Sequence, residues 1–209
     1  MLKKVIDISR EIYNGMLIWS GDPEVDIENF KSIDRGSSAN VGAIYMGLHS
    51  GTHIDAPYHF INSGERLEDV ELDRFFGIAK VFEITDKISI REEHLVSLDI
   101  KEGDRVLFRT SNSEKEEHEF IEGYIYLDES AAKYLAKKMV ASVGIDFLTI
   151  DGKGVLNHPA HSILLSSGIP IIEGIRLSGV AEGEYLLSAL PLNIIGVEAS
   201  PVRAVLFEI

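Results

Sequence analysis

The sequence contains no cysteine. Disulfide bonds, cysteine-ligated zinc sites and thiol nucleophiles are therefore excluded as sources of stability or chemistry. Any metal ion that the protein binds must be held by histidine and carboxylate side chains. With 209 residues, the chain is long enough to bury a hydrophobic core that needs no covalent cross-link.

Positive charge is also scarce. The chain has 20 lysine and arginine residues against 34 aspartate and glutamate residues, which gives a formal net charge of −14. This balance argues against nucleic acid and anionic membranes as partners, because both are bound through a basic surface. No apolar run approaches the ~20 residues of a membrane span, and residues 1–7 do not resemble a signal peptide. We therefore expect a cytoplasmic protein that acts on a small molecule.

Strand-like runs are spread along the chain. They are rich in valine, isoleucine, tyrosine and phenylalanine and are bounded by glycine, aspartate or proline. These runs cover residues 4–8, 41–48, 79–84, 106–108, 124–127, 143–145, 169–172 and 202–207.

Helices are expected to be fewer. Asp128 can cap a helix, and the apolar residues that recur on one face of that helix are Ala132, Leu135, Ala136 and Met139. Residues 91–98 and 161–166 are shorter candidates. Strands interleaved with helices predict an α/β fold with a mixed sheet.

No break in composition divides the chain, so we expect residues 1–209 to form a single domain. Turn signals at residues 14–15 and 21–23 suggest that residues 1–35 form an N-terminal hairpin arm, which would pack on the body or on a second subunit. The polar, acidic residues 112–119 are expected to form a solvated loop without an assigned function.

One short segment concentrates groups that can bind a metal or move protons. Within eleven residues it contains His49, His53, Asp55 and His59, which include three of the seven histidines. A single histidine in a turn is more often satisfied by hydrogen bonds than by a metal. A carboxylate among three histidines favours a metal site instead.

A helical reading of this segment is possible but poor. It would place His49 and His53 on one face at the spacing of zincin histidines. However, Gly51, Thr52 and Pro57 all disfavour a helix, and the glutamate that follows the first zincin histidine is absent.

Extended structure fits the segment better. His53 and Asp55 would then point to the same side of a strand, since side chains alternate with a period of two. A straight strand would put His49 about 20 Å from Asp55, too far for one ion. The chain must therefore fold back, and Gly51 supplies the permissive backbone. We expect a turn that gathers His49, His53 and Asp55, with His59 close by.

The pattern His-x-Gly-Thr-His-x-Asp-x-Pro-x-His resembles the signature of the cyclase-type metal-dependent hydrolases, the family that includes bacterial kynurenine formamidase. Its seven fixed positions are matched by His49, Gly51, Thr52, His53, Asp55, Pro57 and His59. Weaker similarity to the family covers residues 7–9, 21–23, 107–110, 144–146, 161–165, 169–173, 191–192 and 200–203.

The resemblance implies two metal ions that share Asp55. His49 and His53 would be the other ligands of the first ion, and His161 and Glu173 would be the other ligands of the second. It further implies a single α/β domain of the swivelling β/β/α type, with a mixed, partly barrel-like sheet flanked by helices, in a homodimer or higher homo-oligomer. From the residues alone, Glu173 could also be a surface residue at the end of a strand.

Zinc is the expected metal, with two ions per subunit, although manganese tolerates the same ligands. Two divalent ions facing two carboxylates would leave the site cationic and able to hold a developing oxyanion. His158 is either a neighbour of this site or part of an ordinary turn. His94 and His118 lie among charged residues and are expected to be exposed.

The resemblance implies hydrolysis of a small amide C–N bond, with His59 passing a proton to the leaving nitrogen. The leading substrate is N-formyl-L-kynurenine, which yields L-kynurenine and formate in tryptophan catabolism. Trp19 is a candidate substrate-binding residue. Tyr45, Tyr58 and Phe60 are further candidates for an aromatic wall, or else core residues.

Two alternatives remain open at this stage. The same site could open a cyclic amide or catalyse another reaction of the cyclase family. It could also be a non-catalytic site that binds metal or a carboxylate ligand. Structural zinc sites are usually closed by four protein ligands, whereas catalytic sites keep an open position.

Overall fold

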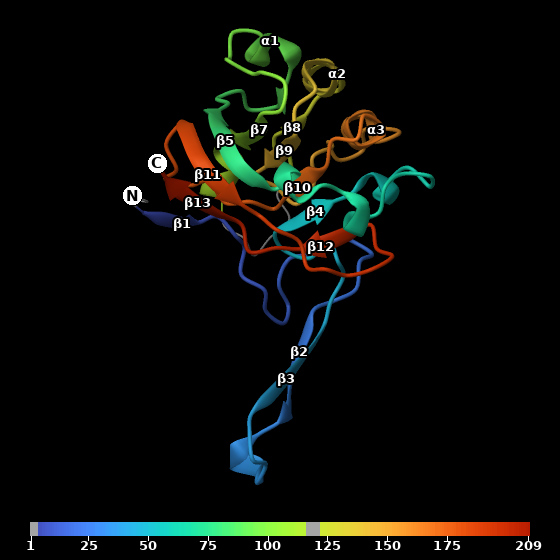
Figure 1. Cartoon of the computed structure of the whole chain (residues 1–209), viewed down its shortest axis with the longest axis vertical. Coiled ribbons are helices and arrows are strands. Elements are labelled where there is room, and N and C mark those ends of the chain that lie inside the picture. The colour runs from blue at the N-terminus through green and yellow to red at the C-terminus, as the bar shows by residue number, and fades with distance from the viewer. Residues whose placement is uncertain (1–3, 116–121) are drawn as a thin grey trace.

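Nine strands form one curled, mixed sheet in a computed structural model that describes residues 4–115 and 122–209 (Figure 1). In their order across the sheet, these strands are β1 (Val5–Asp7), β13 (Val205–Glu208), β11 (Gly183–Ser188), β5 (Phe76–Glu83), β7 (Arg105–Arg109), β9 (Ser142–Ile145), β10 (Ile171–Glu173), β4 (His53–Asp55) and β12 (Ala199–Pro201). Strands β5, β7, β9 and β10 pair in parallel, and the flanking strands pair antiparallel. The predicted α/β domain with a mixed, partly barrel-like sheet is confirmed.

Alternating side chains divide the core into two layers. In β7, Val106 and Phe108 pack against the helices, while Leu107 points to the opposite face. Strand β10 repeats the pattern, with Ile171 on the helix side and Ile172 on the other. Because alternate residues share a face, Glu173 lies on the helix side, where the candidate site forms.

The helices of the described residues cover that same side of the sheet (Figure 1). They are α1 (Glu92–Leu95), α2 (Glu129–Lys138) and α3 (Pro159–Ser166). Asp128 caps α2 by accepting a hydrogen bond from the Ser130 backbone N–H, as the sequence predicts. Met139 departs from the prediction: it ends α2 in the left-handed conformation and is exposed, so it is not part of the buried face.

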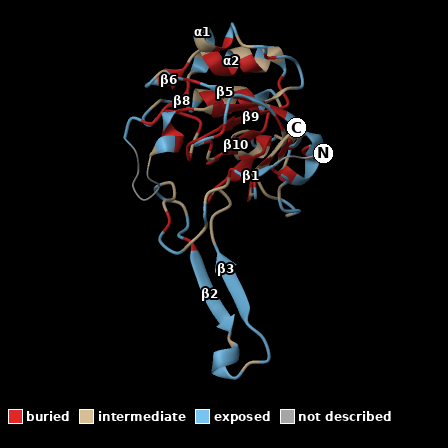
Figure 2. Ribbon diagram, turned by 90° about the vertical axis from the view of Figure 1, so that its left-hand side faces the viewer, coloured by how far each residue is buried: buried red, intermediate tan, exposed pale blue. Residues whose placement is uncertain are grey.

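A long β-hairpin projects from the body of the protein (Figures 1 and 2). It pairs β2 (Asp26–Lys31) with β3 (Val41–Tyr45), and every residue of both strands is exposed. The sequence places an arm within residues 1–35, whereas the hairpin runs from residue 26 to residue 45 and β1 belongs to the main sheet. The reason is that residues 5–7 find a partner strand in β13.

Smaller elements complete the fold. Strands β6 (Ser89–Ile90) and β8 (Tyr126–Leu127) form a two-stranded sheet. Short 3-10 helices cover Ile33–Arg35, Pro57–His59, Leu67–Asp69, Leu72–Arg74 and Ser111–Glu114. The last of these corrects the prediction of a solvated loop at residues 112–119: Asn112 and Ser113 are buried, and residues 116–119 lie outside the described part. None of the helices within the described ranges has the length and apolar composition needed to cross a membrane.

Candidate active site

Strand β4 provides two side chains of the site. It lies between β10 and β12, and its register sets His53 opposite Glu173 and Asp55 opposite Ile171. Cross-strand neighbours are close enough for their side chains to meet. Accordingly, Nε2 of His53 lies 3.3 Å from Oε2 of Glu173. It also lies 3.5 Å from Oδ1 of Asp55, two residues along the same strand.

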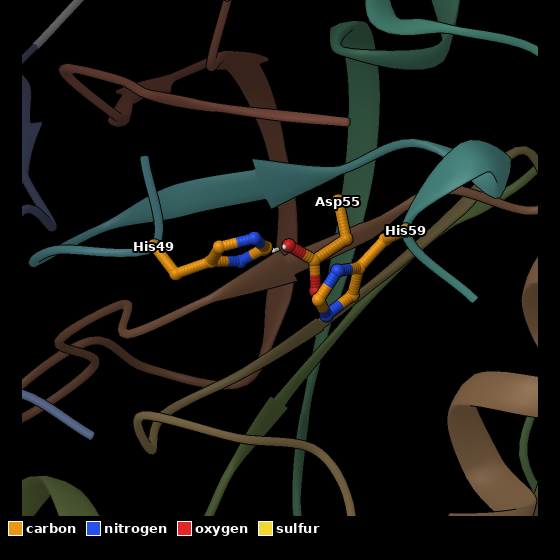
Figure 3. A group of neighbouring side chains, drawn as sticks. All are labelled: His49, Asp55 and His59. Atoms are coloured by element: carbon orange, nitrogen blue, oxygen red, sulfur yellow. Dashed lines mark ion pairs between the residues drawn. The ribbon is translucent and has the colours of Figure 1, made fainter. Parts of the chain in front are cut away.

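A sharp turn before β4 brings His49 back to the same point. Gly51 has a positive φ of 71°, which a side chain would strain. Gly174 packs against it so closely that a Cβ there would lie 2.4 Å from the Gly51 carbonyl oxygen. The Thr52 hydroxyl donates a hydrogen bond of 2.7 Å to the Gly174 carbonyl. As a result, Nδ1 of His49 lies 2.8 Å from Oδ1 of Asp55 (Figure 3).

His59 reaches the site from the other end of β4. Pro57 opens a 3-10 helix, Pro57–His59, that turns the chain back over the strand. The ring of His59 then lies 4.2 Å from the ring of His49 and 5.7 Å from the ring of His161, measured between centroids. Figure 3 shows His59 beside the carboxylate of Asp55.

The remaining two predicted site residues come from distant parts of the chain. His161 lies in the first turn of α3, where Pro159 begins the helix, and Glu173 ends β10. Nε2 of His161 lies 3.2 Å from Oε1 of Glu173 and 3.5 Å from Oδ2 of Asp55. The structure therefore brings together all six predicted residues: His49, His53, Asp55, His59, His161 and Glu173.

Several of these polar atoms are buried without a hydrogen bond. They are Nε2 of His53 and both carboxylate oxygens of Asp55, a residue with no exposed surface. A buried carboxylate is costly unless it is paired with charge or coordinates a metal. Imidazole nitrogens and carboxylate oxygens that converge without hydrogen-bond geometry fit a divalent cation, and this donor set suits zinc or manganese.

Charges within the cluster shift the pKa values of its members. Burial opposes protonation of His49, but the negative charge of Asp55 outweighs it and raises the pKa of His49 from 6.5 to about 9. Burial also opposes protonation of His161, whose pKa is nevertheless raised by Glu173 and Asp151. The pKa of Asp55 is held well below its ordinary value, against the effect of burial, by the neighbouring histidines.

His59 behaves differently. Burial is the largest influence on its pKa and lowers it below the ordinary histidine value, with His49 acting in the same direction. The neutral imidazole is therefore favoured near neutral pH, as a proton acceptor requires.

A cavity of about 240 Å³ opens beside the cluster. Its lining consists of Trp19, Asp22, His49, His59, Phe60, Leu148, Thr149, His158, His161 and Glu173. Of the four candidate aromatic residues, Trp19 and Phe60 line this cavity. Tyr45 is exposed on the hairpin. The ring of Tyr58 packs against Arg66, whose Cζ lies 4.0 Å from the ring centroid.

Sequence reasoning missed two acidic neighbours of the cluster. Asp151 lies 2.6 Å from Nδ1 of His161, and Glu198 lies 3.3 Å from Nε2 of His49. Asp151 follows an apolar residue and precedes a glycine, the same kind of strand-end signal that marks Glu173. Glu198 is not marked by its neighbours in the sequence. It comes near His49 only through the antiparallel pairing of β4 with β12, the strand that follows it.

Two other histidines can now be placed. His158 is exposed, precedes α3 with a positive φ of 43° and lines the cavity, so it neighbours the site. His94 is only partly exposed, which corrects the prediction, because its Nδ1 accepts a hydrogen bond from the Arg91 backbone. His118 lies outside the described residues.

Comparison with known proteins agrees with this geometry. The family model described as "Putative cyclase" matches residues 6–152. A kynurenine formamidase from Salinibacter ruber is 38% identical over 97% of this chain and 96% of its own length, and one from Bacillus cereus is 37% identical over 96% of each chain. The solved structure of a protein described as a predicted metal-dependent hydrolase from Bacillus stearothermophilus is also similar. It is 38% identical to this chain, with a TM-score of 0.86 over 98% of each chain.

A more distant likeness supports the fold alone. An isatin hydrolase bound to the product analogue thioisatinate is 22% identical, with a TM-score of 0.84 over 98% of this chain and 92% of its own. The convergent cluster, the family match over more than half of the sequence and the full-length relatives lead to one conclusion: this chain belongs to the cyclase family of metal-dependent hydrolases.

Proposed function

We propose that this protein is a metal-dependent hydrolase of a small amide C–N bond, with N-formyl-L-kynurenine as the leading substrate and L-kynurenine and formate as products. The kynurenine formamidases that match almost the whole chain support this reaction. The observation that carries the proposal is the fully buried carboxylate of Asp55, whose oxygens lack hydrogen bonds and face three imidazoles.

The two oxygens of Asp55 support a site for two ions. Oδ1 faces His49 and His53, whereas Oδ2 faces His161. Glu173 is divided in the same way, with Oε2 near His53 and Oε1 near His161. We assign His49, His53 and Asp55 to the first ion and Asp55, His161 and Glu173 to the second, with zinc favoured over manganese.

The bound metal would polarise the amide carbonyl and make a water molecule more acidic. The chain itself supplies proton transfer and orientation. Neutral His59 can take a proton from the attacking water and return it to the leaving nitrogen, a step that general acid–base catalysis accelerates by about 10²–10⁴-fold. Trp19 and Phe60 line the cavity and can hold an aromatic ring beside the cluster.

A substrate panel tests the proposed reaction. Protein loaded with zinc should hydrolyse N-formyl-L-kynurenine, lose this activity when the metal is chelated and regain it when zinc is restored. The panel should include a cyclic amide and a simple ester, because ring opening is the main alternative. Turnover of the cyclic amide alone would replace the formamidase assignment, and metal binding without any turnover would favour a binding protein.

The cytoplasmic location and the assembly into a homodimer or higher homo-oligomer are predictions from the sequence. Sedimentation analysis of the purified protein measures the second directly.

A further inference from the structure

Asp151 makes the shortest contact that any of the clustered histidines has outside the cluster. Its Oδ2 lies 2.6 Å from Nδ1 of His161. Both oxygens of Asp151 accept backbone N–H groups, from Ala160 and His161, and a carboxylate can only accept. His161 must therefore donate its Nδ1–H, which leaves Nε2 to face Asp55 and Glu173.

The same carboxylate also anchors the helix that carries His161. Its Oδ1 accepts the backbone N–H of Ala160 at 2.8 Å, and its Oδ2 accepts the backbone N–H of His161 at 3.1 Å. Asp151 is only 2% exposed. One buried side chain thus determines both the position of the first turn of α3 and the orientation of the imidazole.

The loop that carries Asp151 holds the second carboxylate as well. The backbone N–H of Ile150 donates a 2.6 Å hydrogen bond to Oε1 of Glu173. At the other end of the loop, Gly174 donates its backbone N–H to the Phe147 carbonyl. Residues 147–151 therefore contact two of the three proposed ligands of the second ion, His161 and Glu173.

The other clustered rings are held less firmly. His53 has its Nδ1 3.1 Å from the Gly51 carbonyl, and Nε2 of His49 lies 3.3 Å from a partly exposed Glu198. Histidines that bind metal commonly donate their second ring N–H to such an acceptor, and removing it typically weakens metal binding by about 10–100-fold.

We propose that Asp151 is a positioning residue that orients His161 and thereby builds the second metal position. This inference rests on the proposed metal centre, but not on the choice of substrate. It assigns to Asp151 an effect on one ion and leaves the ion bound by His49 and His53 unaffected.

A rival reading makes Asp151 itself a ligand. Asp151, His158 and His161 lie close enough to form a separate metal site. The hydrogen bonds argue against this, because both oxygens of Asp151 already accept backbone N–H groups and Oδ2 also lies 2.6 Å from Nδ1 of His161. His158 is exposed, with its ring centroid 6.4 Å from that of His161.

The variant Asp151→Asn tests the proposal. Asparagine keeps the size of the side chain, but its one carbonyl oxygen cannot accept all three N–H groups. Zinc content and affinity should be measured by titration against a chromophoric chelator. We expect one ion to bind as in the wild type and the other to bind about 10–100-fold more weakly. Asp151→Glu, which restores the charge, should recover part of this loss.

Asp146→Asn is the matched control. Asp146 is also buried and lies next to the same loop, but it accepts its hydrogen bonds from Thr110 and Ser113 rather than from a histidine. This variant should lower the melting temperature without changing the affinity for either ion. Equal loss of the second ion in both variants would reduce Asp151 to a structural role and overturn the proposal.

A measurement on the wild type covers the case in which Asp151→Asn does not fold. In the zinc-loaded protein, nitrogen-15 NMR should show His161 with a slowly exchanging Nδ1 proton and a metal-bound Nε2. Metal on Nδ1 would refute the proposal, as would unchanged affinity for both ions in a folded Asp151→Asn. Failure to hydrolyse formamides, with these metal results intact, would count only against the proposed function.

Discussion

The two halves of the candidate site are built in different ways. One half lies within a single turn and strand, where His49, His53 and Asp55 are separated by at most six positions. The other half joins His161 from α3 to Glu173 from β10, and only the docking of that helix beside the sheet brings them together. Local backbone geometry therefore makes the first half, and tertiary packing makes the second.

Asp55 is the point at which the two halves meet. Its Oδ1 faces His49 and His53, and its Oδ2 faces His161. A change at this residue should damage both halves, whereas a change on either side should damage one. The comparison can thus be tested by counting ions.

The largest effect is expected from Asp55→Asn. The neutral amide cannot bridge two cations, so both ions should be lost. Lewis-acid catalysis is worth several kcal/mol, and turnover should therefore fall by roughly 10³-fold or more. Metal analysis and the formamidase assay measure these outcomes, with circular dichroism to verify folding. Retention of two ions would contradict the view that both halves of the site depend on Asp55.

His59→Ala should separate catalysis from metal binding. His59 belongs to the same segment as His53 and Asp55, but its pKa is lowered by burial and it is proposed to move protons. We expect turnover to fall by about 10²–10⁴-fold while zinc content stays at the wild-type level. Loss of an ion in this variant would make His59 a ligand instead.

How far the sequence predicts this site follows from the same contrast. The motif spacing was enough to predict the turn at Gly51 and the shared side of His53 and Asp55, since both depend only on local geometry. His161 and Glu173 came from family resemblance, because nothing in their own neighbourhoods requires them to meet. Asp151 was missed for that reason: its partner lies ten positions away, in the next helix.

The fold shows a similar division. Buried parallel strands such as β7 and β9 were predicted from their apolar residues. Strand β4 is absent from the apolar runs, because it has only three residues and two of them are polar, and only the spacing of His53 and Asp55 predicted extended structure there. Residues 202–207 were predicted as one strand, but the chain pairs with β4 up to Pro201 and with β11 and β1 only from Val205, so residues 202–204 connect two strands.

His161→Ala should remove one ion only. The second half would lose its imidazole, while His49, His53 and Asp55 remain for the first ion. We expect about one zinc per subunit, measured by metal analysis after dialysis. His94→Ala is the control, since His94 lies outside the site and should leave the metal content unchanged. Loss of both ions from His161→Ala would show that the two halves do not bind independently.

Raising the pH should lower the stability of the metal-free protein and increase the stabilisation that zinc adds. In the metal-free protein, the raised pKa of His49, about 9 against 6.5, stabilises the fold fully below pH 6.5, and this contribution is lost as pH rises towards 9. Zinc must displace that proton, so its stabilising effect should grow over the same window. Thermal unfolding with and without zinc at several pH values measures this stabilisation. A zinc-induced shift that is constant from pH 6 to pH 9 would contradict the assignment of His49 as a ligand.

The smallest effect is expected at Trp19, which belongs to neither half and only lines the cavity beside them. Trp19→Ala should raise KM by several-fold to about tenfold, the range of an aromatic contact, while kcat and metal content change little. Tyr45→Ala is the matched control: Tyr45 is an aromatic residue on the nearby hairpin, is 67% exposed and lies outside the cavity lining. A change in substrate binding alone should raise KM without altering metal content. An equal rise in KM for both variants would contradict a specific role of the cavity in substrate recognition and would implicate the hairpin.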